Sequence, residues 1–277
     1  MALNVSKVFV FQTWGKVEDM TSNGALLGVA SDDTCAYLLN GTSLFYKFCA
    51  NVSGVCAAPA MSGVGTNGKL FVFTNYNGNA YVYLPNGTIR SFKVYSFKGK
   101  LVAFKKFFVA CYVGCAAFTY DGKKLWEYDT VFVGKPSTDG KIIYVPELTE
   151  ERITMLSLNG TILKTYPLGG REAMSTSYCK GLLAVGTSTS VMLFKANGTK
   201  LRLLWEREIG GRAWSVTFSP DCRYIAVADT MGGKVRIYDI RGDQILVLEP
   251  RMPYSVYWGK YLYVGTQLGK VIAYSLR

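Results

Sequence analysis

The stretch "VMLFKANGTKLRLLW", residues 191–205, decides the fold, because its pattern recurs along the chain. It consists of an apolar run, the triplet Asn-Gly-Thr and a second apolar run. Such runs on both sides of Asn-Gly are the strongest short-range signal for a β-hairpin, and we expect a type I′ turn with positive φ at both central residues. The other copies are "AYLLNGTSLFYKF" (36–48), "AYVYLPNGTIRSF" (80–92), "AAFTYDGKKLWEY" (116–128), "ITMLSLNGTILKTY" (153–166) and "VRIYDIRGDQILVL" (235–248).

The spacing of these hairpins predicts the global fold. Each interval between turn glycines leaves room for two more strands, so each unit has four strands, which is the composition of a β-propeller blade of roughly 40–45 residues. The glycines are Gly41, Gly87, Gly122, Gly160, Gly198 and Gly242, at intervals of 46, 35, 38, 38 and 44 residues.

The two ends of the chain complement each other. Residues 252–277 supply three strands and then stop, whereas "VSKVFVFQ" at 5–12 is a surplus strand before the first full unit. Pairing of 5–12 with 270–276 would complete a last blade and remove an open sheet edge. We therefore expect an all-β fold, a seven-bladed β-propeller of four-stranded antiparallel blades, as one domain over residues 1–277.

The sixth unit resembles a WD repeat. In "SVTFSPDCRYIAVADTMGGKVRIYDI" (215–240), the turn Phe218–Asp221 and the segment Arg236–Asp239 fall where that family has them. Cys222 replaces the usual glycine after Pro-Asp, and the family's Gly-His pair is absent because the chain has no histidine. The hydrogen-bonded network that many WD repeats build around that histidine therefore cannot form, and the other units share the pattern only.

A second, partial resemblance concerns "DGKKLWEY" at 121–128, which is similar to the end of the quinoprotein (PQQ) repeat. Gly122, Lys123 and Trp126 match, while Phe118 stands where that motif has Asp. In that family the tryptophan docks one blade on its neighbour. The resemblance implies the same packing for Trp126, and we expect it for Trp205 as well; Trp214 and Trp258 are expected near the channel.

No enzyme is predicted. Without histidine, the commonest general base and metal ligand are missing, and no Ser-His or Cys-His pair is available. The acidic residues Asp32, Asp33, Glu147, Glu150 and Glu151 are expected in a turn and a solvated loop. A weaker hypothesis is that they converge at the channel mouth and bind a cation. We predict no cofactor and no metal site.

The seven cysteines form no Cys-x-x-Cys pair. Most are expected as small buried apolar residues, and the sequence leaves open whether Cys49–Cys56 or Cys111–Cys115 form disulfides. The apolar run near residue 10 is too short for a signal peptide, and residues 107–118 indicate two strands around Gly114 rather than a membrane span. We expect a cytoplasmic location.

Charge is the strongest functional signal. The net charge is +12, and the 87 residues between Asp33 and Asp121 contain no acid. A basic side is predicted there as a contact surface for an anionic partner. Resemblance to WD-repeat proteins implies a non-enzymatic scaffold that binds a protein partner; the alternative is a propeller that binds RNA or DNA. The candidate partner-binding residues are Arg90, Lys93, Lys98, Lys100, Lys105 and Lys106.

Overall fold

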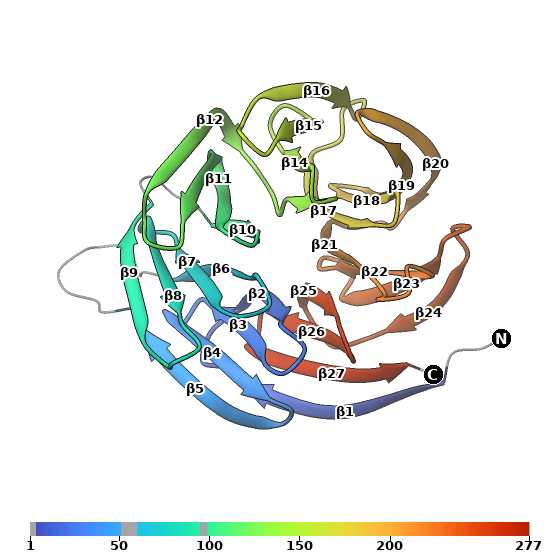
Figure 1. The fold of residues 1–277 in the computed structure, drawn as a ribbon. Helices are drawn as coiled ribbons and strands as arrows, with labels where there is room; N and C mark the ends of the chain where they lie inside the picture. Colours follow the sequence, from blue (N-terminus) through green and yellow to red (C-terminus); the bar gives the residue numbers. More distant parts are fainter. Residues whose placement is uncertain (1–3, 51–59, 95–98, 277) are drawn as a thin grey trace.

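The computed structural model describes residues 4–50, 60–94 and 99–276, which form strands and turns without a helix. Seven sheets stand around a central axis like the blades of a propeller (Figure 1). The predicted seven-bladed all-β fold is thereby confirmed. Blade one is β2 (Val17–Ser22), β3 (Leu27–Ser31), β4 (Cys35–Asn40) and β5 (Ser43–Cys49); blade two is β6 (Met61–Thr66), β7 (Phe71–Asn75), β8 (Asn79–Tyr83) and β9 (Ile89–Lys93).

The remaining blades repeat this plan, with the innermost strand first. Blade three is β10 (Lys100–Ala103), β11 (Phe107–Thr119) and β12 (Lys124–Phe132). Blade four is β13 (Ser137–Thr138), β14 (Ile142–Glu147), β15 (Arg152–Ser157) and β16 (Ile162–Pro167). Blade five is β17 (Ala173–Cys179), β18 (Leu182–Thr187), β19 (Ser190–Asn197) and β20 (Lys200–Glu208). Blade six is β21 (Ala213–Phe218), β22 (Tyr224–Asp229), β23 (Lys234–Asp239) and β24 (Gln244–Leu248); blade seven contains β25 (Pro253–Trp258), β26 (Leu262–Thr266) and β27 (Lys270–Leu276).

Strand β11 contains both middle strands of blade three. Cys111 and Cys115 are four residues apart, yet their Cα atoms are 4.1 Å apart and their sulfurs are bonded. The chain therefore reverses at Gly114, whose φ of +65° few other residues adopt. The prediction of two strands around Gly114 is correct.

The ring closes as the sequence predicts. Strand β1 (Val5–Gln12) pairs antiparallel with β27, from Val5 opposite Leu276 to Gln12 opposite Lys270. The two strands lie side by side although they come from opposite ends of the chain (Figure 1). Blade seven thus receives its outer strand from the chain start, and β27 is paired on both sides.

The hairpins are present, but the type I′ assignment of their turns is wrong. In the hairpins at Gly41 and Gly198 the loop is Gly-Thr, because the preceding asparagine still pairs in the strand. Only the glycine has positive φ, as in a type II′ turn. The other four turns are three-residue loops in which the glycine N–H donates to the carbonyl three residues earlier and the glycine lies in the left-handed region.

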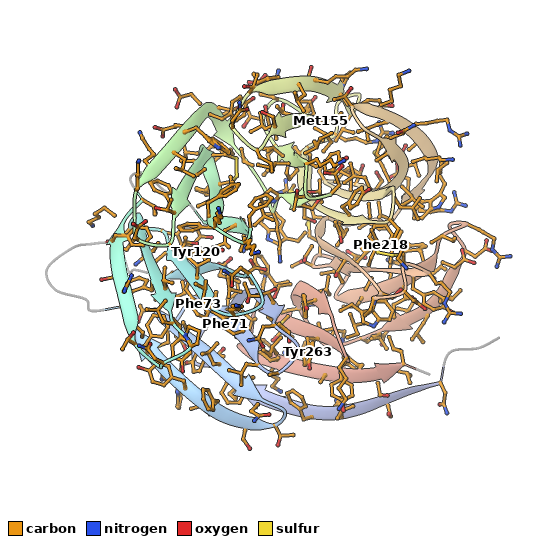
Figure 2. All side chains as sticks on the ribbon, viewed as in Figure 1. Phe71, Phe73, Tyr120, Met155, Phe218 and Tyr263 are labelled. Carbon is orange, nitrogen blue, oxygen red and sulfur yellow. A yellow bond between two sulfur atoms is a disulfide. The ribbon has the colours of Figure 1, made fainter. Side chains whose placement is uncertain are left out.

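The core is divided into seven apolar clusters, and each cluster lies between two neighbouring blades. Figure 2 shows this placement: Phe71 and Phe73 lie between blades one and two, and Tyr263 lies between blades seven and one. Met155 belongs to the cluster of blades four and five, and Phe218 to that of blades five and six. Each blade therefore depends on both neighbours for its buried surface.

The outer-strand tryptophans of blades three and five pack on the hairpin turn of the next blade. Trp126 donates from Nε1 to the carbonyl of Leu158 at 2.8 Å, and a Cβ on Gly160 would lie 2.6 Å from its ring. Trp205 repeats the arrangement on the carbonyl of Ile240 and on Gly242. Only glycine leaves room for a ring at these turns, so the predicted packing role of both tryptophans is confirmed.

Three disulfides are present among the described residues: Cys35–Cys49, Cys111–Cys115 and Cys179–Cys222. The candidate pair Cys49–Cys56 is wrong, because Cys49 bonds Cys35, and Cys56 lies outside the described residues. The bridge from Cys179 to Cys222 joins blades five and six. Cys222 has a φ of +66°, which explains why WD repeats prefer glycine there; here a cysteine accepts that conformation and gains a cross-link.

Candidate functional site

The innermost strands carry a repeated irregularity that determines what lines the channel. In blades one, two, five, six and seven the register with the second strand skips one residue near the start of the strand. Such a β-bulge leaves one residue unpaired and re-aims its side chain. The skipped residues are Glu18, Ser62, Met174, Trp214 and Tyr254.

The residues directly after these bulges join neighbouring blades. Ser175 Oγ accepts a hydrogen bond from Val216 N at 3.0 Å, and Ser215 Oγ accepts one from Val256 N at 3.2 Å. Asp19 Oδ2 accepts from Val64 N at 3.3 Å in the same way. The innermost strands therefore supply two functions at adjacent positions: one residue faces the channel, and the next connects the blades.

Four of the five bulged residues open onto a cavity of about 410 Å³ at one end of the channel. This cavity, which we call the channel cavity, combines charged and aromatic walls. Its lining residues are Lys16, Glu18, Asp19, Tyr76, Gly99, Lys100, Tyr112, Phe132, Val133, Gly134, Lys135, Leu148, Met174, Trp214, Ser215 and Tyr254.

A carboxylate at the cavity wall holds two lysines. The Glu18 side chain is 0% exposed, and its two oxygens contact Lys16 Nζ at 2.7 Å and Lys100 Nζ at 3.1 Å. Lys100 also donates to the main-chain carbonyl of Glu18 at 2.7 Å. Burial alone would raise the pKa of Glu18, but the two ammonium groups outweigh burial and hold that pKa below its ordinary value, so Glu18 is an anion at neutral pH.

A second ion pair spans the channel from blade four to blade one. Lys135 Nζ donates to Asp19 Oδ1 at 2.5 Å. Lys135 is brought there by Gly134, where a Cβ would lie 1.8 Å from the carbonyl oxygen of Met174. Only a glycine permits this close crossing of two backbones, so the position of the Lys135 ammonium depends on Gly134.

Aromatic side chains form two groups around these charges. Tyr112 is in edge contact with both Tyr76 and Phe132, with ring centroids 5.5 Å apart in each contact. Trp214 and Tyr254 form the other group, at 5.4 Å, and the Lys16 ammonium lies 4.6 Å from the centre of the Tyr254 ring. Burial, with the nearby Glu18 carboxylate, raises the pKa of Tyr76 and Tyr254 above the ordinary value, so both hydroxyls stay protonated.

The structure separates the sequence-predicted basic residues. Arg90 and Lys93 are exposed on β9, the outer strand of blade two, and Lys105 and Lys106 are exposed in the turn after β10. Lys100 instead faces the channel cavity, and Lys98 lies outside the described residues. Binding of an anionic partner by the four exposed residues stays a prediction.

The predicted acidic clusters have other partners. Glu147 is buried and accepts from Tyr128 Oη and Arg152 Nε, and Asp33 accepts from the Tyr37 hydroxyl. Within residues 4–50, 60–94 and 99–276, no three acidic, cysteine or histidine residues are grouped to hold a metal ion. Of the two tryptophans expected near the channel, Trp214 lines the cavity, whereas Trp258 stacks on Tyr224 in the core between blades six and seven.

Exposed apolar side chains lie on loops of blades six, seven and one, at the end of the ring where the innermost strands begin. Turns between second and third strands, and connections between blades, share one end of the antiparallel blades. Hydrogen bonds join these loops at blades seven and one, where Thr13 N contacts the Gly269 carbonyl and Gln267 N contacts that of Met252. Gln267 and Met231 line one further depression, next to Trp214. We call the exposed residues here the apolar rim: Trp14, Met231, Met252 and Leu268.

Comparison with known proteins supports the fold and leaves the function open. No family model matches the chain, and no curated protein matches it. Among solved structures, BamB from Moraxella catarrhalis is similar at a TM-score of 0.72 and 14% identity, covering 98% of this chain and 100% of that one. The β-propeller domain of Cps50 (Swd1) from Myceliophteria thermophila is similar at a TM-score of 0.83 and 11% identity, with 99% and 100% covered. At these identities the likeness shows the fold alone: the chain is a seven-bladed β-propeller, in keeping with the WD-repeat-like residues of blade six.

Proposed function

We propose that this protein is a non-enzymatic interaction module that binds a protein partner at the apolar rim. The observation that carries the proposal is Trp14, whose side chain is 87% exposed on a loop at the same end of the ring as Met231, which is 76% exposed. Large apolar side chains that gather at one exposed site mark an interaction surface, and tryptophan is prominent among residues that dominate binding energy.

The loop that carries Trp14 is well fixed, as a docking residue requires. The main-chain N–H of Trp14 donates to Asp33 Oδ2 at 2.9 Å, and Thr13 Oγ1 donates to the Gly269 carbonyl at 2.9 Å. Gln12 Nε2 reaches the carbonyl of Leu268. An exposed ring on a rigid loop loses little conformational entropy when a partner covers it, so such a ring contributes more to affinity.

The experiment compares two truncations of exposed apolar side chains. The intact protein, Trp14→Ala and the control Leu163→Ala, on the outer strand of blade four, are immobilised and exposed to extract from the native cells. We expect Trp14→Ala alone to lose the partner. For the recovered partner, the affinity should fall about 30-fold, which corresponds to a loss of about 2 kcal/mol typical of a binding hot spot. Equal recovery on all three proteins would contradict docking at the rim.

The basic side is a second element of this proposal. Arg90, Lys93, Lys105 and Lys106 are reversed to Glu together, while Lys100 is left intact because it holds Glu18. Loss of a protein partner supports the scaffold function. Loss of bound nucleic acid, with a slope of log K against log salt that changes by about 0.9 per lost contact to duplex DNA, supports the alternative.

The cytoplasmic location is part of the proposal. With three disulfides among the described residues, a cytoplasmic location requires a hyperthermophilic host, because disulfides otherwise persist in oxidising compartments. No helix within the described residues is long and apolar enough to cross a membrane. Fractionation of the native cells with a thiol-trapping reagent tests the location and the oxidation state together.

A further inference from the structure

We propose that the channel cavity binds a small organic monocarboxylate with an apolar body, held by Lys16, Lys100 and Lys135. This site is distinct from docking at the apolar rim, because neither Trp14 nor Leu268 lines the cavity. The inference rests on three observations: unused hydrogen-bond donors, a surplus positive charge and apolar walls.

The three ammonium groups have more donors than the protein uses. Each lysine carries three N–H groups and no acceptor. Lys100 directs two contacts to Glu18, whereas Lys16 directs one to Glu18 and Lys135 one to Asp19. Among the described residues these contacts use only part of the donor capacity. A ligand in the cavity must therefore offer acceptors, and a carboxylate offers two oxygens to cationic donors.

The net charge of the cavity lining favours a ligand that carries a single negative charge. Among the described residues that line the cavity, three lysines stand against two carboxylates, Glu18 and Asp19, which leaves one positive charge. Asp32 reaches Lys16 only at 4.0 Å, from a partly exposed position. One carboxylate neutralises the lining, whereas an amine would add to a charge that is already positive. A phosphate dianion would leave the occupied cavity with a net negative charge.

The apolar walls of the cavity indicate that the rest of the ligand, beyond its carboxylate, is apolar. Tyr76, Tyr112 and Phe132 form one group of aromatic rings in the lining, and Trp214, Tyr254 and Met174 supply further apolar surface. The volume of about 410 Å³ lies in the range of small-molecule pockets, which are mostly apolar with a few polar groups that set orientation. An aryl or alkyl group attached to the carboxylate fits a cavity in which ammonium groups lie beside aromatic rings, as Lys16 and Lys100 do beside Tyr254.

Four probes test the ligand's charge on the unmodified protein. Phenylbutyrate, phenylbutanol, phenylbutylamine and inorganic phosphate are titrated separately by isothermal calorimetry at low salt. We expect phenylbutyrate to bind about tenfold or more tightly than phenylbutanol, the difference that one charge-assisted hydrogen bond provides. Phenylbutylamine and phosphate should bind more weakly still. Equal binding of the acid and the alcohol, or tighter binding of the amine or of phosphate, overturns the proposal.

Variants then locate the site. Lys16→Met removes one donor while Lys100 still neutralises Glu18, so the fold should persist. Its affinity for phenylbutyrate should fall about tenfold and its affinity for phenylbutanol should stay within about twofold. The matched control is Lys141→Met, an exposed lysine at the other end of blade four that does not line the cavity. Trp214→Ala should weaken both probes. Unchanged phenylbutyrate binding by Lys16→Met refutes the assignment.

Discussion

Replacing Glu18 by Gln tests whether the buried carboxylate holds the channel cavity together. The substitution keeps the size of the side chain and removes its charge. Two ammonium groups would then face each other across a neutral amide, since Lys16 and Lys100 both contact this carboxylate. Breaking a buried ion pair by removing one partner costs about 3–5 kcal/mol. The side chains of Lys16 and Lys100 are 27% and 15% exposed, so water can reach both, and we expect a loss near the lower end, about 3 kcal/mol.

The pH dependence of that loss has a definite sign. The pKa of Glu18 in the folded protein is below its ordinary value of 4.5, so the carboxylate stabilises the fold above that pH. This stabilisation disappears as the pH falls through the lowered pKa, because the native protein then protonates Glu18. The difference in stability between the two proteins should therefore be constant near neutral pH and should shrink below pH 4.5.

Urea unfolding, followed by far-ultraviolet circular dichroism from neutral to acidic pH, measures this difference. Glu172→Gln is the matched control, since Glu172 pairs with Arg212 at 3.4 Å and both side chains are exposed. That control should change stability by less than about 1 kcal/mol. If Glu18→Gln unfolds at the same urea concentration as the native protein at pH 7, or if the difference is independent of pH, the buried carboxylate does not have this role.

Three further predictions concern the scaffold. Deletion of residues 1–12 removes β1 and leaves β27 without a partner on its outer side. The free energy of unfolding should fall by several kcal/mol and the melting temperature with it, whereas an unchanged melting curve would contradict closure. Gly198→Val should cost about 1–2 kcal/mol, because a β-branched residue resists the φ of +57° at this turn, whereas Asn197→Asp should stay within about 0.5 kcal/mol in urea unfolding. Cys179→Ser should lower the free energy of unfolding by about 4 kcal/mol, the value expected for a bridge with a sequence separation of 43. A reductant should lower the stability of the native protein by a similar amount and that of the variant by less; similar melting of both oxidised proteins would count against the bridge.

The sequence was sufficient to predict the ring because its information is local and repeated. Each Gly-centred hairpin specifies its own pair of strands, and the match between residues 5–12 and 270–276 follows from counting strands at both ends. Even the docking of Trp126 could be predicted from a motif within one hairpin. The turn type could not, because Asn-Gly fits both a loop that begins at Asn and one that begins at Gly, and pairing across the strands decides between them.

The channel cavity was missed for a physical reason. A β-bulge adds one residue without changing the apolar pattern on either side, so nothing in the sequence identifies Glu18 as channel-facing; Trp214 was expected near the channel only because it lies on a first strand, and the same argument failed for Trp258. The partners Lys100 and Lys135 come from blades three and four, at separations of 82 and 116 residues from Glu18 and Asp19. Lys100 lies in a basic stretch, and only the ring geometry distinguishes it from its exposed neighbours.

The bulged position has a consequence for how such a protein acquires new specificities. Because the extra residue belongs to none of the seven apolar clusters, it can be exchanged without altering the packing between blades; Glu18 is the exception among them, since its ion pairs hold Lys16 and Lys100. Glu18, Met174, Trp214 and Tyr254 occupy equivalent positions in four blades, yet one is acidic, one is a thioether and two are aromatic. Residues that line the cavity are thus largely separate from residues that pack the blades together. Ligand preference can therefore change during evolution, or be redesigned, one blade at a time while selection maintains the closure of the ring.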